Sequence, residues 1–325
     1  MNPPLRRTTS AFLCVLANVL CCTICTAIYA PTAFAQLDSA FISGMKARSI
    51  GPAGMSGRIA AIEVHPANPD VIYVGAATGG VWKSVNRGTT WQPIFDEQNT
   101  SAIGSIACFA QNPNIVWVGT GEGNVRNSAG VGRGVFKSLD GGKTWKNVGL
   151  EKTERIHRIM LHPTNPDVAW AAAMGTTWGE SADRGVFKTT DGGKTWRKTL
   201  FVDNKTGAAE LAQDPANPNH LIAGMWEHRR YPWFFSSGGT GSGIYTSADG
   251  GETWTRLTVK DGLPDGNLGR VGIAFSRSNP SVVYALVEAK ESALLRSDDG
   301  GAISRHHRPN AIAHFLLLPP KHRQR

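Results

Sequence analysis

The chain has 325 residues, 41% of them hydrophobic and 18% charged, and its formal net charge is +9. Residues 1–35 contain two arginines, and residues 302–325 contain five lysines or arginines. Neither segment has an acidic residue, so the net charge of residues 36–301 is +2. Because this central part is nearly neutral, its charge gives no indication of nucleic-acid binding, and we expect no nucleic acid as a partner.

Residues 1–35 have the pattern of a secretory signal peptide. A basic start with two arginines precedes the uncharged residues 11–30, and Ala-Phe-Ala stands before Gln36. This order predicts cleavage after Ala35 and a secreted or periplasmic chain with no membrane span afterwards. The alternative is an uncleaved anchor, because about 20 apolar residues can just cross a bilayer.

Cysteine use after this cleavage is minimal. Four of the five cysteines lie in the leader: Cys14, Cys21, Cys22 and Cys25. The exported chain keeps only Cys108, in the apolar run IGSIACFA, so it cannot form an internal disulfide. Stability must come from a sizeable core, and Cys108 is expected to be a core residue rather than a nucleophile.

Two sequence signals recur along residues 36–301. One is an Asn-Pro turn followed by an apolar run, as in HPANPDVIYVG. It stands at 65–75, 111–119, 162–172, 214–224 and 278–286. The other, which we call the box, has Ser or Thr, then Asp or Asn two residues later, then glycine and a final Thr-Trp, as in SLDGGKTW. Boxes occupy 84–91, 138–145, 189–196 and 247–254, and a fifth starts at 297–301.

Each repeat reads as four short strands. An alternating run precedes the Asn-Pro turn, a β-branched and aromatic run follows it, and a variable loop leads to a third run, the box and a short final run. Four strands with turn chemistry between them, repeated at about 50 residues, indicate the blades of a β-propeller. We therefore predict an all-β chain of four-stranded antiparallel blades over residues 36–301, about five repeats of a larger propeller.

The fifth box stops matching after Gly301. Residues 302–325 are basic and lack acidic residues and glycine, which indicates a disordered or frameshift-derived tail or, alternatively, a genuine basic tail. The fifth unit then has three predicted strands. Because MKARSIG at 45–51 resembles an outer strand without a blade, two arrangements stay open: closure of a five-bladed ring by this strand, or a piece of a larger propeller.

The box itself is explained by turn chemistry. Its Asp or Asn can accept hydrogen bonds from backbone N–H groups, and its glycines supply the positive φ of a tight turn. The structural acceptors are Asn86, Asp140, Asp191, Asp249 and Asp299. The closing Trp can cover the gap to the neighbouring blade. Boxes and Asn-Pro turns share one face of a propeller, so we expect binding on the other face, where the variable loops lie.

The box pattern resembles the Asp-box (BNR) repeat of sialidases, sortilin-type ectodomains, two-propeller xyloglucan endoglucanases and a photosystem II assembly factor. RSIGPAGMSGRIAAIEVHPANP, followed by GVWKSVNRGTTW, is most similar to large secreted bacterial proteins with sortilin N-terminal or BNR-repeat glycosyl hydrolase-like domains. The resemblance covers residues 45–301 and implies the propeller architecture. It implies no activity, because in these families the box is a structural element away from the active site.

Three arginines stand where inner strands are predicted to begin: Arg58, Arg158 and Arg270. Inner strands line the central channel of a propeller, so the guanidinium groups could converge on the axis and bind a carboxylate or another anion. The alternative is that each arginine satisfies backbone carbonyls at the mouth of the channel.

Glutamates recur in the predicted loops between second and third strands: Glu122, Glu180, Glu227 and Glu288. Two carboxylates across a cleft could act as acid and base or nucleophile in glycoside hydrolysis, and the first three are the catalytic candidates. They could equally bind a cation or stay solvated. In the similar endoglucanases the first blade has a functional Asp in TDIGG where this chain has Ala77, which counts against that activity.

The longest loop, residues 225–243, combines aromatic residues with arginine. Arg229, Tyr231 and Trp233 are candidate ligand contacts, because exposed aromatics beside arginine form glycan-stacking surfaces and protein hot spots. The alternative is that the rings pack beneath the loop. No metal-ligand spacing is present and no cofactor is expected. We predict an exported recognition or scaffold module for a protein, peptide or glycan; the alternative is a glycoside hydrolase that uses the loop carboxylates and channel arginines.

Overall fold

The structure, a computed structural model, describes residues 57–301 and the backbone of residues 304–306. This part is built from five antiparallel sheets of consecutive strands and two short 3-10 helices, η1 (Glu151–Thr153) and η2 (Val259–Asp261). It contains no helix that is long and apolar enough to span a membrane. The predicted signal peptide and the segment 45–51 lie outside the described residues.

Each sheet is one blade, and we number the blades in chain order. Blade 1 contains β1 (Ile59–Val64), β2 (Ile72–Ala76), β3 (Val81–Ser84) and β4 (Gln92–Pro93). Blade 2 contains β5 (Ile103–Cys108), β6 (Val116–Thr120), β7 (Val135–Ser138) and β8 (Lys146–Asn147). Blade 3 contains β9 (Ile156–Leu161), β10 (Ala169–Ala173), β11 (Gly185–Thr189) and β12 (Arg197–Leu200).

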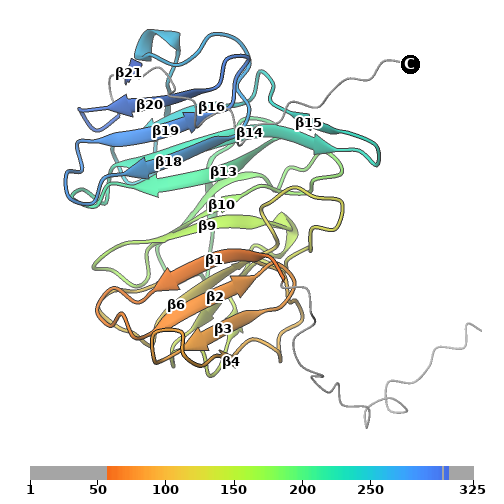
Figure 1. Cartoon of the computed structure of the whole chain (residues 1–325), viewed down its shortest axis with the longest axis vertical. Helices are drawn as coiled ribbons and strands as arrows, with labels where there is room; N and C mark the ends of the chain where they lie inside the picture. The colour runs from red at the N-terminus through yellow and green to blue at the C-terminus, as the bar shows by residue number, and fades with distance from the viewer. Residues whose placement is uncertain (1–56, 302–303, 307–325) are drawn as a thin grey trace, which may run out of the picture. The chain divides into compact units, whose positions relative to one another are not determined.

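The last two blades follow the same order with one addition. Blade 4 contains β13 (Thr206–Gln213), β14 (Leu221–Arg230), β16 (Gly243–Ser247) and β17 (Thr255–Arg256), and β15 (Phe235–Ser237) pairs with the far end of β14. Blade 5 contains β18 (Val271–Phe275), β19 (Val283–Val287), β20 (Ala293–Ser297) and β21 (Ser304–His306). The predicted all-β propeller of four-stranded antiparallel blades is confirmed (Figure 1).

The Asn-Pro turns join the first two strands of a blade through side-chain hydrogen bonds. The Asn68 carboxamide oxygen accepts from the backbone N–H of Asp70 at 3.1 Å. Asn112, Asn165 and Asn217 make the same bond two residues onward at 3.0–3.1 Å. Such a bond imitates a backbone turn and proline fixes φ beside it, so the chain reverses at a defined residue and the next strand starts in register.

Consecutive blades pack through their inner strands β1, β5, β9, β13 and β18. Small residues in the second strand permit the close approach. A Cβ built on Gly75 would lie 2.5 Å from Cγ2 of Ile103, and one built on Gly119 would lie 2.7 Å from Cγ2 of Ile156. The apolar core consequently lies in the layers between neighbouring sheets, in clusters that combine residues of two blades.

Cys108 belongs to the core layer between blades 1 and 2. It is buried among the apolar residues of β2, β5 and β6. Burial raises the pKa of its thiol, so the sulfur stays protonated and a poor nucleophile. The prediction that this cysteine is a core residue is confirmed.

Blade 5 differs from its prediction. The expectation that it has only three strands is wrong, because residues 304–306 of the atypical tail form β21, which pairs antiparallel with β20. The fourth strand of blade 5 is therefore supplied by residues after the fifth box. Residues 302–303 and 307–325 of the tail lie outside the described residues.

Strand β21 lacks the tryptophan that ends the other boxes. In blade 2 the register pairs Lys137 with Lys146, the residue after Trp145, and in blade 5 it pairs Ser297 with Ser304. Counted from the first serine of each box, Ser304 holds the place of Trp145. An apolar cavity of about 30 Å³ lies between blades 4 and 5. It is lined by Ile222, Ile244, Leu257, Leu263, Ile273, Val283, Ala285, Leu295, Ser297 and Gly301.

We expect Ser304→Trp to stabilise the chain. Trp145 and Trp196 each donate from Nε1 to a carbonyl of the preceding blade at 2.7 Å and pack against its core, and a ring at 304 would enter the equivalent apolar space. Burying such a ring is worth about 1–2 kcal/mol. Thermal unfolding should shift upward by several degrees for Ser304→Trp and stay unchanged for Ser304→Ala; equal melting temperatures for the two variants would refute the assignment.

Candidate functional site

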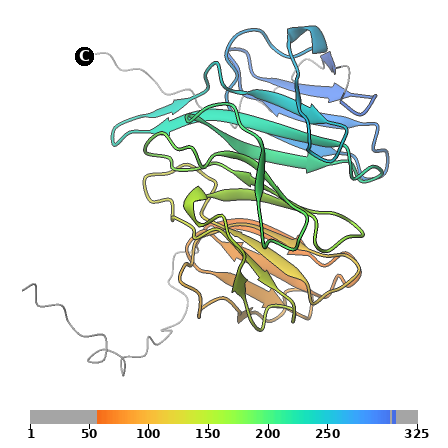
Figure 2. The ribbon, with the colours of Figure 1, turned by 180° about the vertical axis from the view of Figure 1, so that it is seen from behind.

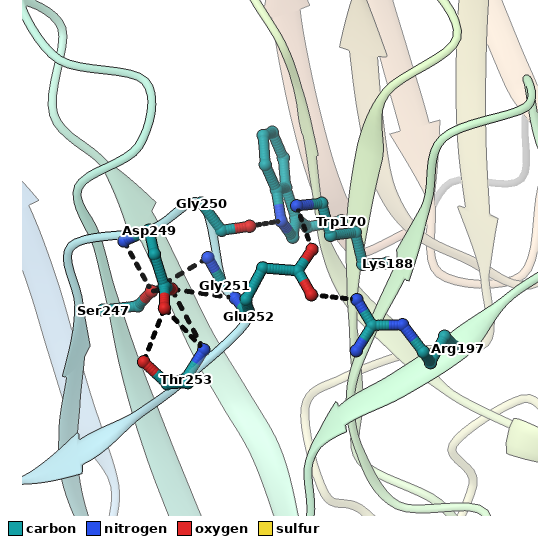
Figure 3. A network of polar contacts seen from close by, with 9 residues as sticks. All are labelled: Trp170, Lys188, Arg197, Ser247, Asp249, Gly250, Gly251, Glu252 and Thr253. Atoms are coloured by element: carbon teal, nitrogen blue, oxygen red, sulfur yellow. Dashed lines mark hydrogen bonds and ion pairs between the residues drawn. The ribbon is translucent and has the colours of Figure 1, made fainter.

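The box is a closed hydrogen-bonded turn, shown for blade 4 in Figure 3. The Asp249 carboxylate accepts hydrogen bonds from the backbone N–H groups of Glu252 at 2.9 Å and Thr253 at 3.0 Å, and from the Thr253 hydroxyl at 2.5 Å. Ser247 Oγ donates to Asp249 at 2.7 Å and accepts from the N–H of Gly251 at 2.8 Å. The polar side chains of the motif are thus used within the turn.

The other boxes repeat these bonds. Asp140 and Asp191 accept from the hydroxyl of the threonine directly before the final tryptophan of their box. Asn86 accepts from the N–H of Thr90 at 2.9 Å, and Asp299 accepts from the hydroxyl of Ser297. Hydrogen bonds, above all from the threonine hydroxyl, hold the pKa values of Asp140, Asp191 and Asp249 far below the usual range. These carboxylates stabilise the turn and do not serve as general acids.

A pocket of about 540 Å³, which we call the arginine pocket, lies where residues of blades 1, 2, 4 and 5 meet. It is lined by Arg58, Ile59, Asn124, Val125, Arg126, Trp226, Phe235 and Arg270. Three guanidinium groups, a carboxamide and two aromatic rings share this space, and no Asp or Glu is among the lining residues. The arrangement is suited to an anion or to a ligand with a flat apolar face.

Arg58 is fixed at the edge of this pocket by Glu122. Its Nε and Nη2 donate to the two carboxylate oxygens at 2.8 and 2.7 Å. The Glu122 side chain is fully buried, whereas 37% of the Arg58 side chain is exposed. A buried carboxylate that is bound by two donors of one guanidinium is a structural counter-ion, and this is the role of Glu122 here.

Arg158 does not line the arginine pocket, unlike the other two channel arginines. Arg158 lies within β9, and its guanidinium binds both oxygens of Glu210 at 2.6 and 3.1 Å. Arg58 and Arg270 directly precede their inner strands and share the arginine pocket. The pocket's third arginine is Arg126, which sequence reasoning did not single out although it named Glu122 of the same loop.

Arg270 is held from three sides. Its Nη2 lies 2.9 Å from Nε2 of His157, its Nη1 donates to Oδ1 of Asn124 at 3.4 Å, and its guanidinium lies 5.3 Å from the ring centre of Trp226. Burial first, and then Arg158 and Arg270, lower the pKa of His157 well below its ordinary value. The imidazole is therefore neutral and can accept a hydrogen bond from Arg270, which keeps its charge despite burial.

The aromatic hairpin of β14 and β15 extends beyond the other strands of its sheet (Figure 2). Trp226 is 3% exposed and packs edge-on against Phe235, with ring centres 5.6 Å apart. At the tip, Tyr231 stacks on Phe234 at 4.3 Å, while Trp233 is 79% exposed. Some rings thus pack beneath the hairpin, and the tip presents an aromatic surface to solvent.

A second, smaller pocket of about 170 Å³ lies beside this hairpin, and we call it the hairpin pocket. It is lined by Gly179, Glu180, Lys205, Glu227, His228, Arg229, Tyr231 and Ser236. Two of the three catalytic candidates therefore share one pocket, and Glu122 does not line it. Glu227 belongs to strand β14 rather than to a loop, and its carboxylate accepts from the N–H of Gly241 at 3.1 Å.

Glu288 has a structural role. Its carboxylate accepts from the hydroxyl of Ser237 and from the backbone N–H of Arg270, each at 2.8 Å. It thereby ties the aromatic hairpin to the start of β18. In residues 57–301, no group of three His, Cys, Asp or Glu side chains is placed to hold a metal ion.

A buried basic cluster near these pockets was missed by sequence reasoning. Arg184 is fully buried and donates to the carbonyl oxygens of Lys205 and Thr176, each at 2.6 Å. Arg155 is equally buried and forms an ion pair with Glu154 at 2.8 Å. Burial and the charge of Arg184 lower the pKa of His228 to about 3. The sequence carries no signal for this cluster, because charged loop residues are mostly solvated.

The chain is similar to a sortilin family model and to glycan-degrading β-propeller enzymes. The family model described as Sortilin, neurotensin receptor 3 (Sortilin-Vps10) matches residues 133–261. A xyloglucanase from Paenibacillus sp is 23% identical over 221 residues, which are 62% of this chain and 21% of that protein. An ancestral GH74 enzyme superposes with a TM-score of 0.56 at 23% identity, covering 75% of this chain and 30% of its own. For the GH74 enzyme of Niastella koreensis the TM-score is 0.59 at 20% identity, with 76% and 38% covered.

These similarities concern the fold. The chain spans 21% of the length of the curated relative and 30% to 38% of the two solved structures. At identities below 25%, a shared β-propeller does not carry an activity with it, since one fold supports many functions. The function must therefore be argued from the pockets.

Proposed function

We propose that the chain is an exported carbohydrate-recognition module whose arginine pocket binds an acidic glycan without cleaving it. The single observation that carries this proposal is the meeting of three guanidinium groups with the rings of Trp226 and Phe235 around one space of about 540 Å³. A carboxylate suits the guanidinium donors and a sugar ring suits an aromatic face. The similarity to a xyloglucanase and to GH74 enzymes supports a glycan as the ligand class.

Binding is favoured over cleavage by the carboxylates around the pocket. None lines it, and Glu122, which binds Arg58 at its edge, is buried and bound through both oxygens. Ala77, which stands where the similar endoglucanases have a functional Asp, is buried at 1% exposure. Glycoside hydrolysis needs two carboxyl groups on opposite sides of the scissile bond, and this pocket offers neither.

The three arginines would contribute differently. Arg270 is preorganised by His157 and Asn124, so little conformational entropy is lost when it binds an anion. Arg126 is exposed and forms no ion pair with any side chain of residues 57–301, which leaves its guanidinium available to a ligand. Trp233, at the tip of the aromatic hairpin, offers a second exposed surface to a longer glycan.

We expect Arg126→Ala to weaken the binding of an acidic oligosaccharide about tenfold, since loss of one charge contact costs about 1.4 kcal/mol. Oligogalacturonate is the acidic probe and a neutral xyloglucan oligosaccharide is the comparison, both titrated by calorimetry. Arg133→Ala is the matched control, because Arg133 is also exposed and in the same loop but does not line the pocket. Equal affinity of Arg126→Ala and wild type for oligogalacturonate, or no binding by the folded wild type, would refute the proposal.

The alternative is a glycoside hydrolase that uses Glu180 and Glu227, which line the hairpin pocket together. Glu180 lies 4.0 Å from Nζ of Lys205, and both carboxylates face the same small space. Under this alternative the wild type releases reducing ends from an oligosaccharide panel, and Glu227→Gln abolishes the release while binding persists. Absence of turnover by a folded chain that binds oligogalacturonate would reject it.

A further inference from the structure

Within the described residues, nothing covers the sheet faces of the two end blades that inner blades bury. In β1, Ile62 is 65% exposed, whereas Ile106 and Ile159, which hold the same place before their Asn-Pro turns, are 7% and 4% exposed. In β19, Tyr284 is 40% exposed, whereas the equivalent Tyr73 of β2 is fully buried. Blade 1 thus exposes the sheet face with which the other blades pack on the preceding blade. Blade 5 exposes the sheet face with which the other blades pack on the following blade.

At three of the four inner junctions, an aromatic ring of the second strand and a lysine of the third strand cover the box of the next blade. Between blades 3 and 4, Trp170 donates from Nε1 to the carbonyl oxygen of Gly250 at 2.9 Å (Figure 3). Lys188 lies 5.5 Å from the ring centre of Trp170 and binds Glu252 of that box at 2.7 Å. We call these two residues an aromatic–cation pair.

The first two junctions use the same pair. Between blades 1 and 2, Lys83 lies 5.3 Å from the ring centre of Tyr73 and donates to the carbonyl oxygen of Gly141 at 2.8 Å. Between blades 2 and 3, Lys137 lies over Trp117 and reaches Oδ1 of Asp167, in the Asn-Pro turn of blade 3, at 3.7 Å. The junction between blades 4 and 5 has Ile222 and Thr246 at these positions instead.

Both halves of such a junction remain unused at the ends. Blade 5 has the aromatic–cation pair, with Arg296 6.0 Å from the ring centre of Tyr284, and in the described residues no box follows it. Blade 1 has an uncovered box, whose Trp91 is 38% exposed. Asp70 in its Asn-Pro turn holds the place that Asp167 has in blade 3, and it is exposed and paired with Arg87 of its own blade.

We propose that blade 5 of one chain docks on blade 1 of a second copy through the geometry of the inner junctions. Tyr284 of the first copy covers the box at 84–91 of the second, and Arg296 reaches Asp70 as Lys137 reaches Asp167. The exposed ion pairs of Arg296 with Asp298 and of Asp70 with Arg87 cost little to exchange, because surface pairs contribute about 0–1 kcal/mol. The docking covers Ile62 and Tyr284, whose equivalents are buried inside the chain.

One residue makes this contact weaker than the inner junctions. Leu286 stands where the second strands of the other blades have Gly75, Gly119, Ala172 and Gly224. Its side chain would meet Ile59 of the second copy, so the two blades must stand further apart at this end than inner blades do. The contact joins blade 5 of one copy to blade 1 of the other, so it uses a different face of each copy. Two copies therefore form a closed dimer only if blade 5 of each copy docks on blade 1 of the other at the same time.

Charge reversal provides the first test. We expect the full chain to associate with rising concentration in light scattering, Arg296→Asp and Asp70→Arg each to raise the dissociation constant at least tenfold, and Arg296→Asp combined with Asp70→Arg in one chain to restore it. Lys290→Asp, an equal charge change in the exposed turn after β19, is the matched control. Single reversals without effect, or a monomer at every concentration, overturn the proposal.

Cross-linking tests whether a second copy of the chain covers these end faces. Asp70→Cys protein is mixed with Arg296→Cys protein and treated with a short bis-maleimide, with wild type treated alike to account for the native cysteines. A covalent dimer that needs both variants supports docking of a second copy. A chain carrying both cysteines that cross-links without gain in mass shows instead that its own ends meet, and no cross-link in either experiment shows free end faces; each of these results overturns the proposal.

Discussion

Replacing Arg58 with alanine is expected to destabilise the folded chain and to lower its urea midpoint, because it leaves the carboxylate of Glu122 buried without its counter-ion. The pair joins β1 to the loop after β6 through two hydrogen bonds, and the Glu122 side chain has no exposed surface. Since 37% of the Arg58 side chain is exposed, water that enters its place moderates the loss. Urea unfolding at neutral pH measures the difference.

The double variant Arg58→Ala with Glu122→Gln separates charge from packing. Because the glutamine carries no charge, we expect it to recover most of the stability that Arg58→Ala loses. The same folded variant lacks one guanidinium of the arginine pocket, so it should also bind oligogalacturonate more weakly than wild type. If the single and double variants are equally unstable, an unpaired buried charge is not the cause of the loss.

Acidification from about pH 7 to about pH 5 is expected to lower the free energy of unfolding through the buried histidines. In the folded chain, burial and the charge of Arg184 lower the pKa of His228 to about 3, while the unfolded chain has an ordinary histidine pKa of about 6.5. Below pH 6.5 the unfolded state binds the proton and the folded state does not, so stability is lost as the pH falls. At pH 5 the loss from His228 alone is about 2 kcal/mol, and the lowered pKa of His157 adds to it in the same direction.

His228→Asn checks this pH dependence. The variant is neutral throughout, and the loss of stability between about pH 6.5 and pH 5 should become smaller by about 2 kcal/mol, whatever its absolute stability at pH 7. The box carboxylates do not interfere, because the stability from their lowered pKa values is lost only below about pH 4. An unchanged pH dependence in His228→Asn would show that His228 titrates alike in both states.

The sequence predicts the blades well because their defining interactions are local. In the box, Ser247, Asp249 and Thr253 bond to one another within seven residues, and Asn68 bonds to Asp70 two residues onward. Such contacts need no information about the rest of the fold, so four matching copies predict four matching turns. The exception is blade 5, where β21 forms from residues that match no repeat, because a sheet edge can pair with any backbone of suitable register.

The sequence by itself determined the class of fold, the number of blades, the structural role of the box and the side on which variable residues gather. Only the tertiary structure decided which of these residues meet: Arg270 joins Arg58 in a pocket while Arg158 pairs with Glu210, and Glu180 joins Glu227 while Glu122 is bound by Arg58. The reason is physical. A turn is specified by neighbours in the chain, whereas a pocket is assembled from residues that are distant in the chain, and their packing fixes side-chain directions that no local pattern records.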